Sequence, residues 1–103
     1  MYSKYFWAKN ISLSWQHIDN NVYIIDHQNN EIYKLIDVGK HIWLEIDGRK
    51  NIEQIAFTLI QIYDVSLQEL SKDIHYFLDY LNMLELVLKS DKPFSGLFVD
   101  DNY

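Results

Sequence analysis

The chain has 103 residues, of which 49% are hydrophobic and 16% aromatic, and this composition fits one folded domain and excludes a wholly disordered chain. Its formal net charge of −6 disfavours nucleic acid as a partner, because that binding depends on lysine and arginine neutralising phosphates. The absence of cysteine excludes disulfides, thiolate metal sites and thiol nucleophiles, and it makes the cytoplasm the expected location.

The first part of the chain has the patterns of an antiparallel sheet. Ile11, Leu13 and Trp15 alternate with polar residues, which is typical of a half-buried strand over residues 11–16. Turn-forming residues at 19–21 and 28–30 then bracket a second strand over residues 22–25, and a third strand follows over residues 31–35. Two short connections imply a meander in which the first and third strands are edges.

After residue 35 the apolar spacing becomes helical. Val38, Ile42 and Ile46 share one helical face, Asp37 is placed to cap the start of this helix, and Asp47-Gly48 is placed to end it. The sequence therefore predicts a short first helix directly after the third strand.

Two more helices begin with capping signatures. Asn51 with Gln54 has the form of a capping box, and apolar residues at helical spacing follow as far as residue 63. Ser66 with Glu69 repeats the signature ahead of a long amphipathic helix that extends to residue 84.

These elements predict an α+β domain over residues 11–88, winged-helix-like, with a three-stranded antiparallel sheet followed by a three-helix bundle. Residues 1–10 are expected to be an N-terminal extension. Residues 89–103 are mostly polar, contain the only proline, and are expected to form a flexible acidic tail. Phe94, Leu97 and Phe98 in this tail are candidates for docking on a partner.

No group of residues predicts catalysis, a metal site or a cofactor site. The four histidines lack metal-ligand spacing, and Asp26 and Glu31 flank a turn, where carboxylates are usually solvated caps. The serines lie outside any nucleophile elbow, and the three glycines cannot form a phosphate-binding loop. The sequence also lacks a secretory signal and a membrane-length apolar segment. We therefore expect a protein that is not an enzyme and has no membrane partner.

The aromatic residues divide into two groups. Trp15, Trp43 and Phe77 fall on the apolar faces and are expected to be core. Tyr76 and Tyr80 are four residues apart, just beside the core line of the third helix. Their position fits either the border of a groove or a helix rim that shields the core.

An ordered set of residues resembles the pyrroloquinoline quinone biosynthesis protein D (PqqD) family. The match spans about residues 11–87, and its specificity lies in the order of the pieces, because each alone is common. The residues that carry it are Tyr33-Lys34-Leu35, Gly39, Ile42-Trp43, Asp47-Gly48, Ile52, Ile55-Ala56, Leu59, Tyr63-Asp64-Val65, Asp73-Ile74, Phe77-Leu78 and Leu81.

Two positions depart from the family pattern. Ile36 stands where the family often has asparagine, which is expected to alter the strand-to-helix turn. Glu85-Leu86-Val87 lacks the glycine that commonly precedes the final apolar pair, which is expected to alter the end of the third helix.

The resemblance implies a recognition element for ribosomally made, post-translationally modified peptides (a RiPP recognition element). Members of the family bind the leader segment of a precursor peptide as an added strand between the third strand and the third helix. The implied peptide-binding residues are Glu31, Ile32, Tyr33, Lys34, Leu35, Ile36, Asp73, Tyr76, Phe77 and Tyr80.

By the same resemblance, the chain would be a stand-alone peptide chaperone of natural product biosynthesis that presents the precursor to a separate maturation enzyme. That enzyme would be a lasso-peptide leader peptidase or a radical S-adenosylmethionine (radical SAM) enzyme, and we favour the lasso-peptide system. The chain would be a monomer or a homodimer paired through edge strands.

Two other functions stay open at this stage. A winged-helix (winged helix-turn-helix) DNA-binding regulator would have a similar order of elements, but the third helix carries Glu69, Asp73 and Asp79 against Lys72 alone. A scaffold that dimerises through an edge strand is the second alternative.

Overall fold

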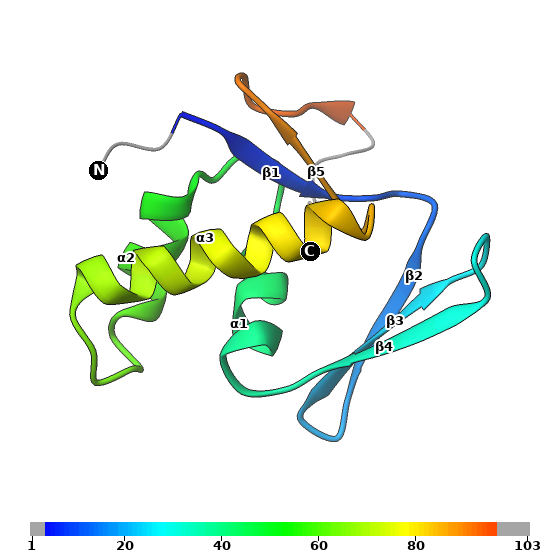
Figure 1. Cartoon of the computed structure of the whole chain (residues 1–103), viewed down its shortest axis with the longest axis horizontal. Helices are drawn as coiled ribbons and strands as arrows, with labels where there is room; N and C mark the ends of the chain where they lie inside the picture. Colours follow the sequence, from blue (N-terminus) through cyan, green and yellow to red (C-terminus); the bar gives the residue numbers. More distant parts are fainter. Residues whose placement is uncertain (1–3, 97–103) are drawn as a thin grey trace.

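The computed structural model describes residues 4–96, which form two antiparallel sheets and three helices (Figure 1). A three-stranded sheet has the order β2-β3-β4, and a two-stranded sheet pairs β1 with β5. The strands are β1 (Phe6–Lys9), β2 (Ser14–Ile18), β3 (Asn21–Asp26), β4 (Glu31–Leu35) and β5 (Val87–Ser90); the helices are α1 (Asp37–Glu45), α2 (Ile52–Leu59) and α3 (Leu67–Met83). The predicted α+β fold is confirmed, and the two-stranded sheet adds to it.

The turn between β2 and β3 fixes the register of the first hairpin. Asp19 and Asn20 have φ angles of 53° and 67°, and Ile18 pairs with Asn21 on either side of them. Two residues at positive φ are typical of a type I′ turn, whose twist matches that of the strands and which asparagine and aspartate tolerate.

The strand that the sequence predicted over residues 11–16 corresponds to β2, which begins later, at Ser14. Residues 11–12 form a turn in which the Asn10 side chain accepts hydrogen bonds from the amide and hydroxyl of Ser12. Because this turn takes up Ile11, that side chain is 51% exposed, and pairing with β3 starts at Ser14.

Both predicted capping signatures of α2 and α3 are present. The Gln54 amide donates to Asn51 Oδ1 at 2.9 Å, and the Asn51 amide donates to Gln54 Oε1 at 2.8 Å. The Ser66 hydroxyl accepts from the Glu69 amide at 3.0 Å. Helix α2 ends at Leu59, four residues short of the periodic pattern, because residues 60–63 continue as turns.

The prediction that Asp37 caps α1 is wrong. Ile36 is the N-cap, with no side-chain hydrogen bond, and Asp37 is the first helical residue with a φ angle of 51°. Strand β4 ends only two residues earlier, so Asp37 makes the bend from strand to helix and its side chain does not cap. The turn at Ile36 therefore has no polar cap.

Residues 6–9 belong to the folded core, although the sequence analysis placed them in an extension. Trp7 and Ala8 are buried, and β1 pairs with β5 in the register Trp7 to Lys89 and Lys9 to Val87. Each strand has four residues, which is too short for its alternation to be recognised in the sequence. Residues 89–90, expected in the tail, complete this sheet.

Of the tail residues named as docking candidates, only Phe94 is within the described part. Its amide donates to the Gly48 carbonyl at 2.8 Å, which ties this segment to the end of α1. Leu97 and Phe98 lie outside the described residues.

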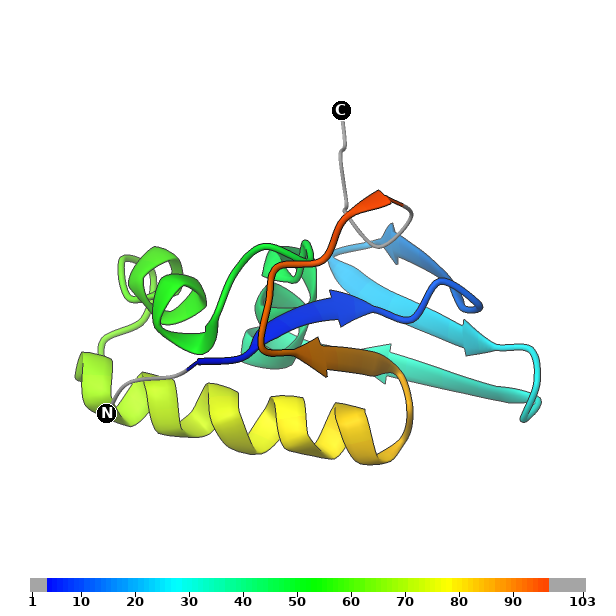
Figure 2. The same cartoon turned by 90° about the horizontal axis from the view of Figure 1, so that it is seen from above.

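The core lies where α1, α2 and α3 meet the inner face of the three-stranded sheet and the β1–β5 pair (Figure 2). Trp43 is fully buried, and Trp15 and Phe77 are partly buried against it and its neighbours, as their spacing predicted. Val22 and Ile24 of β3 and Ile74 and Leu78 of α3 supply fully buried aliphatic side chains.

Helix α3 ends in a Schellman motif around Glu85. The Leu86 amide donates to the Leu81 carbonyl at 2.9 Å, and the Glu85 amide donates to the Asn82 carbonyl at 3.0 Å. Glu85 itself has a φ angle of 63°, the left-handed conformation that glycine adopts without steric cost. Glu85 therefore adopts the left-handed conformation that a glycine would favour at the end of α3, and the helix-ending turn forms without a glycine.

We expect Glu85→Gly to raise the free energy of unfolding by about 0.5–1 kcal/mol, because the steric cost of the left-handed conformation that glycine removes exceeds the destabilising entropy that it adds to the unfolded chain. Met83→Gly, at an exposed right-handed position of the same helix, should lower it by about 1 kcal/mol. Urea unfolding of both variants measures the two effects. A loss of stability in Glu85→Gly would contradict this account of the helix end.

The loop between β3 and β4 is organised by Asp26. Its carboxylate accepts hydrogen bonds from the amides of Gln28 and Asn29 and from the Asn29 side chain. These hydrogen bonds, led by that of the Asn29 side chain, hold the pKa of Asp26 below its ordinary value of 3.8. Asp26 thus caps the turn as the sequence predicted, but the residue is buried and not solvated.

The ionised form of Asp26 therefore stabilises the fold fully above pH 3.8, and this contribution is lost as the pH falls through the lower pKa of the folded state. We expect Asp26→Asn to melt below the parent protein at neutral pH, and the difference in Tm to shrink below pH 3.8. Thermal unfolding followed by circular dichroism at both pH values tests this. A difference in Tm that does not change with pH would assign the effect to packing alone.

Candidate functional site

The outer edge of β4 is an unpaired strand edge. Within residues 4–96, strand β4 pairs with β3 alone, in the register Ile24 to Tyr33 and Asp26 to Glu31. The other edge of the three-stranded sheet is β2, and Figure 2 shows β4 as the strand on the side of α3. Alternate residues of such an edge direct their N–H and C=O groups away from the sheet, where another strand can pair with them.

Side chains alternate along β4 as in a half-buried strand. Tyr33 and Leu35 pack against the core, whereas Glu31, Ile32 and Lys34 are exposed. Ile32 is 71% exposed, and Ile36, just beyond the strand, is 52% exposed. Apolar surface beside the edge is therefore left open to solvent.

The predicted residues of α3 form the neighbouring wall. Tyr76 and Tyr80 are 68% and 52% exposed, and Asp73 is exposed one turn before them. The charge of Tyr80 on α3 is the smallest of the influences that raise the pKa of Tyr33 on β4.

Phe77 shapes the base of this region. A Cβ atom on Gly39 of α1 would lie 3.1 Å from Cζ of the Phe77 ring, so only a residue without a side chain fits there without displacing the ring. Glycine at this position lets the aromatic ring of α3 approach the backbone of α1 directly below the end of β4. We call the surface formed by β4, Phe77, Tyr76 and Tyr80 the β4–α3 groove, which is the peptide site that the family resemblance implies.

The electrostatics of the groove centre on Tyr33. Burial, and after it the negative charge of Glu31, raises the pKa of Tyr33, which therefore stays a neutral hydrogen-bonding group at physiological pH. Lys34 and Asp73 place one charge of each sign on the two walls. The groove is mainly apolar and aromatic, with few charges.

Sequence reasoning missed one exposed apolar residue beside the groove. Met83 is 69% exposed and follows Tyr76 and Tyr80 by seven and three residues, so it extends the same exposed stripe of α3. The helical spacing contained this signal. Methionine is a flexible contact residue that adapts to different partners.

Lys40 of α1 fixes the sheet relative to the helices. Its side chain is buried, and its Nζ atom donates to the Asn20 carbonyl at 2.8 Å and to Asn20 Oδ1 at 3.0 Å. The tip of the β2–β3 hairpin is thereby tied to the helix that follows β4. This contact holds the sheet, and with it the edge of β4, in place.

The described residues contain little that suggests catalysis. Ser14 and His27 are 2.9 Å apart between Oγ and Nε2 in an exposed position, but the Asp26 carboxylate beside them is occupied by the loop amides. Within residues 4–96 no three His, Cys, Asp or Glu side chains are grouped as a metal site. In the same part of the chain, the helices are too short or too polar for a transmembrane segment.

Two solved structures resemble this chain. The structure described as TbiB1 in complex with the TbiA(beta) leader peptide is 26% identical, with a TM-score of 0.72 over 78% of this chain and 93% of that one. The structure described as lasso peptide synthetase B1 complexed with the leader peptide is 20% identical, with a TM-score of 0.71 over 80% and 96%, and at this identity it supports the fold alone. Among curated proteins no match was found.

The family comparison agrees with the sequence resemblance. The model of coenzyme PQQ synthesis protein D (PqqD) matches residues 21–87, which is more than half of the chain and runs from β3 to the start of β5. The chain therefore belongs to the PqqD family.

Proposed function

We propose that this protein is a stand-alone leader-peptide-binding protein that captures a precursor peptide by strand addition to β4. The observation that carries the proposal is the unpaired edge of β4 beside the exposed aromatic flank of α3. The fold it shares with a protein solved with a leader peptide supports this choice.

The leader would bind as a fourth strand in the β4–α3 groove. Main-chain hydrogen bonds to Glu31–Leu35 would supply sequence-independent affinity, and side chains on alternate positions would contact Tyr76, Phe77 and Tyr80. The remaining residues of the proposed site are Ile36 and Asp73. A micromolar complex corresponds to about −8 kcal/mol, which a short strand with two or three apolar anchors reaches after ordering costs.

The bound precursor would then be presented to a separate maturation enzyme. Holding the leader raises the effective concentration of the attached core peptide at that enzyme's active site, so the chain itself needs no catalytic group. The protein would act as a peptide chaperone without cofactor or metal. By the family resemblance this enzyme would be a lasso-peptide leader peptidase or a radical SAM enzyme, and we favour the lasso-peptide system.

The charges of α3 count against the DNA-binding alternative. The helix has exposed Glu69, Asp73 and Asp79 and one exposed lysine, Lys72, where a recognition helix would need a basic face. Pairing of two copies through β4 is the remaining alternative. It would hide the proposed site, so added leader peptide would convert such a dimer to a monomer.

We expect the parent protein to bind the leader half of the precursor peptide encoded next to its gene, and to ignore a scrambled leader. Tyr76→Ala and Lys34→Glu should weaken this binding about tenfold, or about 1.4 kcal/mol, because each removes a groove contact while leaving the core intact. Isothermal titration calorimetry gives the Kd values.

Matched controls separate the groove from the rest of the surface. Phe57→Ala removes an exposed aromatic ring from α2, and Lys92→Glu makes the same charge reversal outside the groove. Both should bind leader as the parent does. If the groove variants fold and bind normally, or if the controls lose binding equally, the choice of groove is wrong. No saturable binding of the authentic leader would reject the proposed function.

A further inference from the structure

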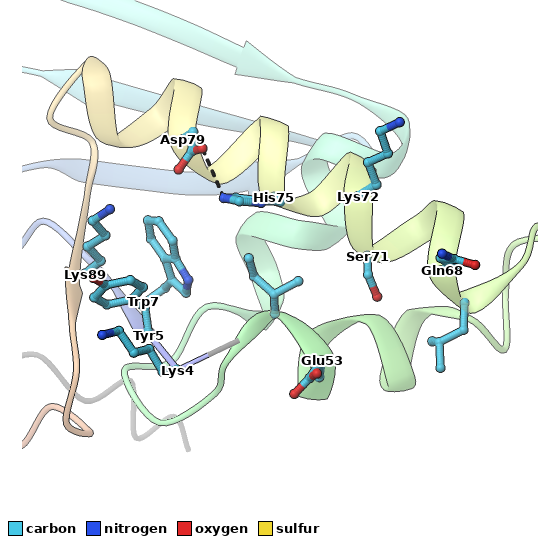
Figure 3. A pocket seen from close by; sticks show the side chains of 12 residues that line it. Lys4, Tyr5, Trp7, Glu53, Gln68, Ser71, Lys72, His75, Asp79 and Lys89 are labelled. Carbon is cyan, nitrogen blue, oxygen red and sulfur yellow. Dashed lines mark ion pairs between the residues drawn. The ribbon is translucent and has the colours of Figure 1, made fainter. Parts of the chain in front are cut away.

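A second hollow lies on another face of α3. It has a volume of about 900 Å³ and is enclosed by α2, α3, β1 and β5 (Figure 3). Its wall includes the buried side chains of Trp7 and Ile52 and the half-exposed side chain of Leu67. The volume is in the range of pockets that bind ligands or anchor side chains.

This hollow and the β4–α3 groove use different residues of α3. Ser71, His75 and Asp79 line the hollow, whereas Tyr76 and Tyr80 face the groove. At 100° per residue, these two sets point about a third of a turn apart around the helix axis. A ligand in the hollow would therefore not compete with a strand added to β4.

The hollow is lined by several lysines, although the protein as a whole is acidic. Lys4, Lys72 and Lys89 line it, which is three of the nine basic residues of a chain with a net charge of −6. Among the described residues none of the three forms an ion pair, whereas Lys50 pairs with Glu45 at 2.7 Å. Their charge is available to a partner.

The acidic residues of the wall offset only part of this charge, since three lysines face two carboxylates, Glu53 and Asp79. Asp79 lies 3.2 Å from His75, and Figure 3 shows both side chains on α3. Glu53 belongs to α2 and lies away from the lysines at the β1 end (Figure 3). One end of the hollow is therefore cationic, and its length beyond is largely apolar.

That cationic end is built from two lysines over aromatic rings. Lys89 Nζ lies 4.7 Å from the Tyr5 ring centroid and 6.0 Å from that of Trp7, and Lys4 Nζ lies 5.4 Å from Tyr5 (Figure 3). The Trp7 indole nitrogen is buried without a hydrogen-bond partner among the described residues. Cation–π contacts thus hold the ammonium groups of Lys4 and Lys89 against the aromatic side chains at this end of the hollow.

We propose that this hollow docks an acidic segment of the maturation enzyme, with carboxylates at Lys4 and at Lys89 and an apolar side chain against Trp7 and Ile52. Charge complementarity carries the assignment, since the rest of the protein is acidic and would repel such a segment. The proposal rests on the proposed leader-binding function, because it is that function which requires an enzyme partner.

The test measures binding of the purified maturation enzyme encoded beside the precursor, by biolayer interferometry, with and without saturating leader. The double variant Lys4→Glu/Lys89→Glu should weaken enzyme binding at least about tenfold and leave the Kd for leader unchanged. Ser71→Trp, which fills the hollow without a charge change, should have the same effect. Lys92→Glu, an exposed lysine outside the hollow, should bind within about twofold of the parent.

The outcomes separate the two proposals. If the parent fails to bind leader, the proposed function fails, whatever the enzyme does. If leader binds normally but both hollow variants bind the enzyme as the parent does, or the enzyme competes with leader, the docking site is wrong. A homodimer of the parent that Lys4→Glu/Lys89→Glu dissociates would assign the hollow to a second copy of the chain and overturn the proposal.

Discussion

The contact between Trp15 and Trp43 determines how the three-stranded sheet sits on the helices. The two described sheets share no strand, so this sheet depends on side-chain packing for its position. The rings of Trp15 and Trp43 meet edge to face with centroids 6.0 Å apart. Lys9 of β1 lies over both rings at 4.9 and 5.4 Å and donates to the Ile46 carbonyl at 2.6 Å. This junction joins β1, β2 and α1, and it thereby packs the three-stranded sheet against the first helix.

Within the described residues, this architecture leaves the outer edge of β4 and the flank of α3 beside it uncovered, and these two features support the proposed binding function. An added strand would satisfy the hydrogen-bonding groups of β4 and cover Ile32 and Tyr80 together. Helix α3 packs its buried residues on the core and offers two separate exposed faces. One helix could therefore border the proposed leader site and the proposed enzyme site at once.

The sequence predicted the elements whose signals are local. The strand over residues 31–35, the Asn51–Gln54 capping box and the start of α3 at Ser66 agree with the structure because turn and cap residues act within a few positions. The β1–β5 sheet could not be predicted, since two strands of four residues pair across almost the whole chain. The groove residues on β4 and α3 came from the family resemblance. The hollow at Trp7 depends on the unpredicted sheet, so no sequence pattern indicated it.

The central claim is that the leader pairs with β4, and amide hydrogen exchange of the protein with and without leader peptide tests it most directly. Strand addition would slow the exchange of outward-facing amides in alternate residues of Glu31–Leu35, because each gains a main-chain hydrogen bond. Protection should also appear on the flank of α3 around Tyr80. Leader binding that leaves β4 unprotected, or that protects β2 or the hollow at Trp7 instead, would contradict the account.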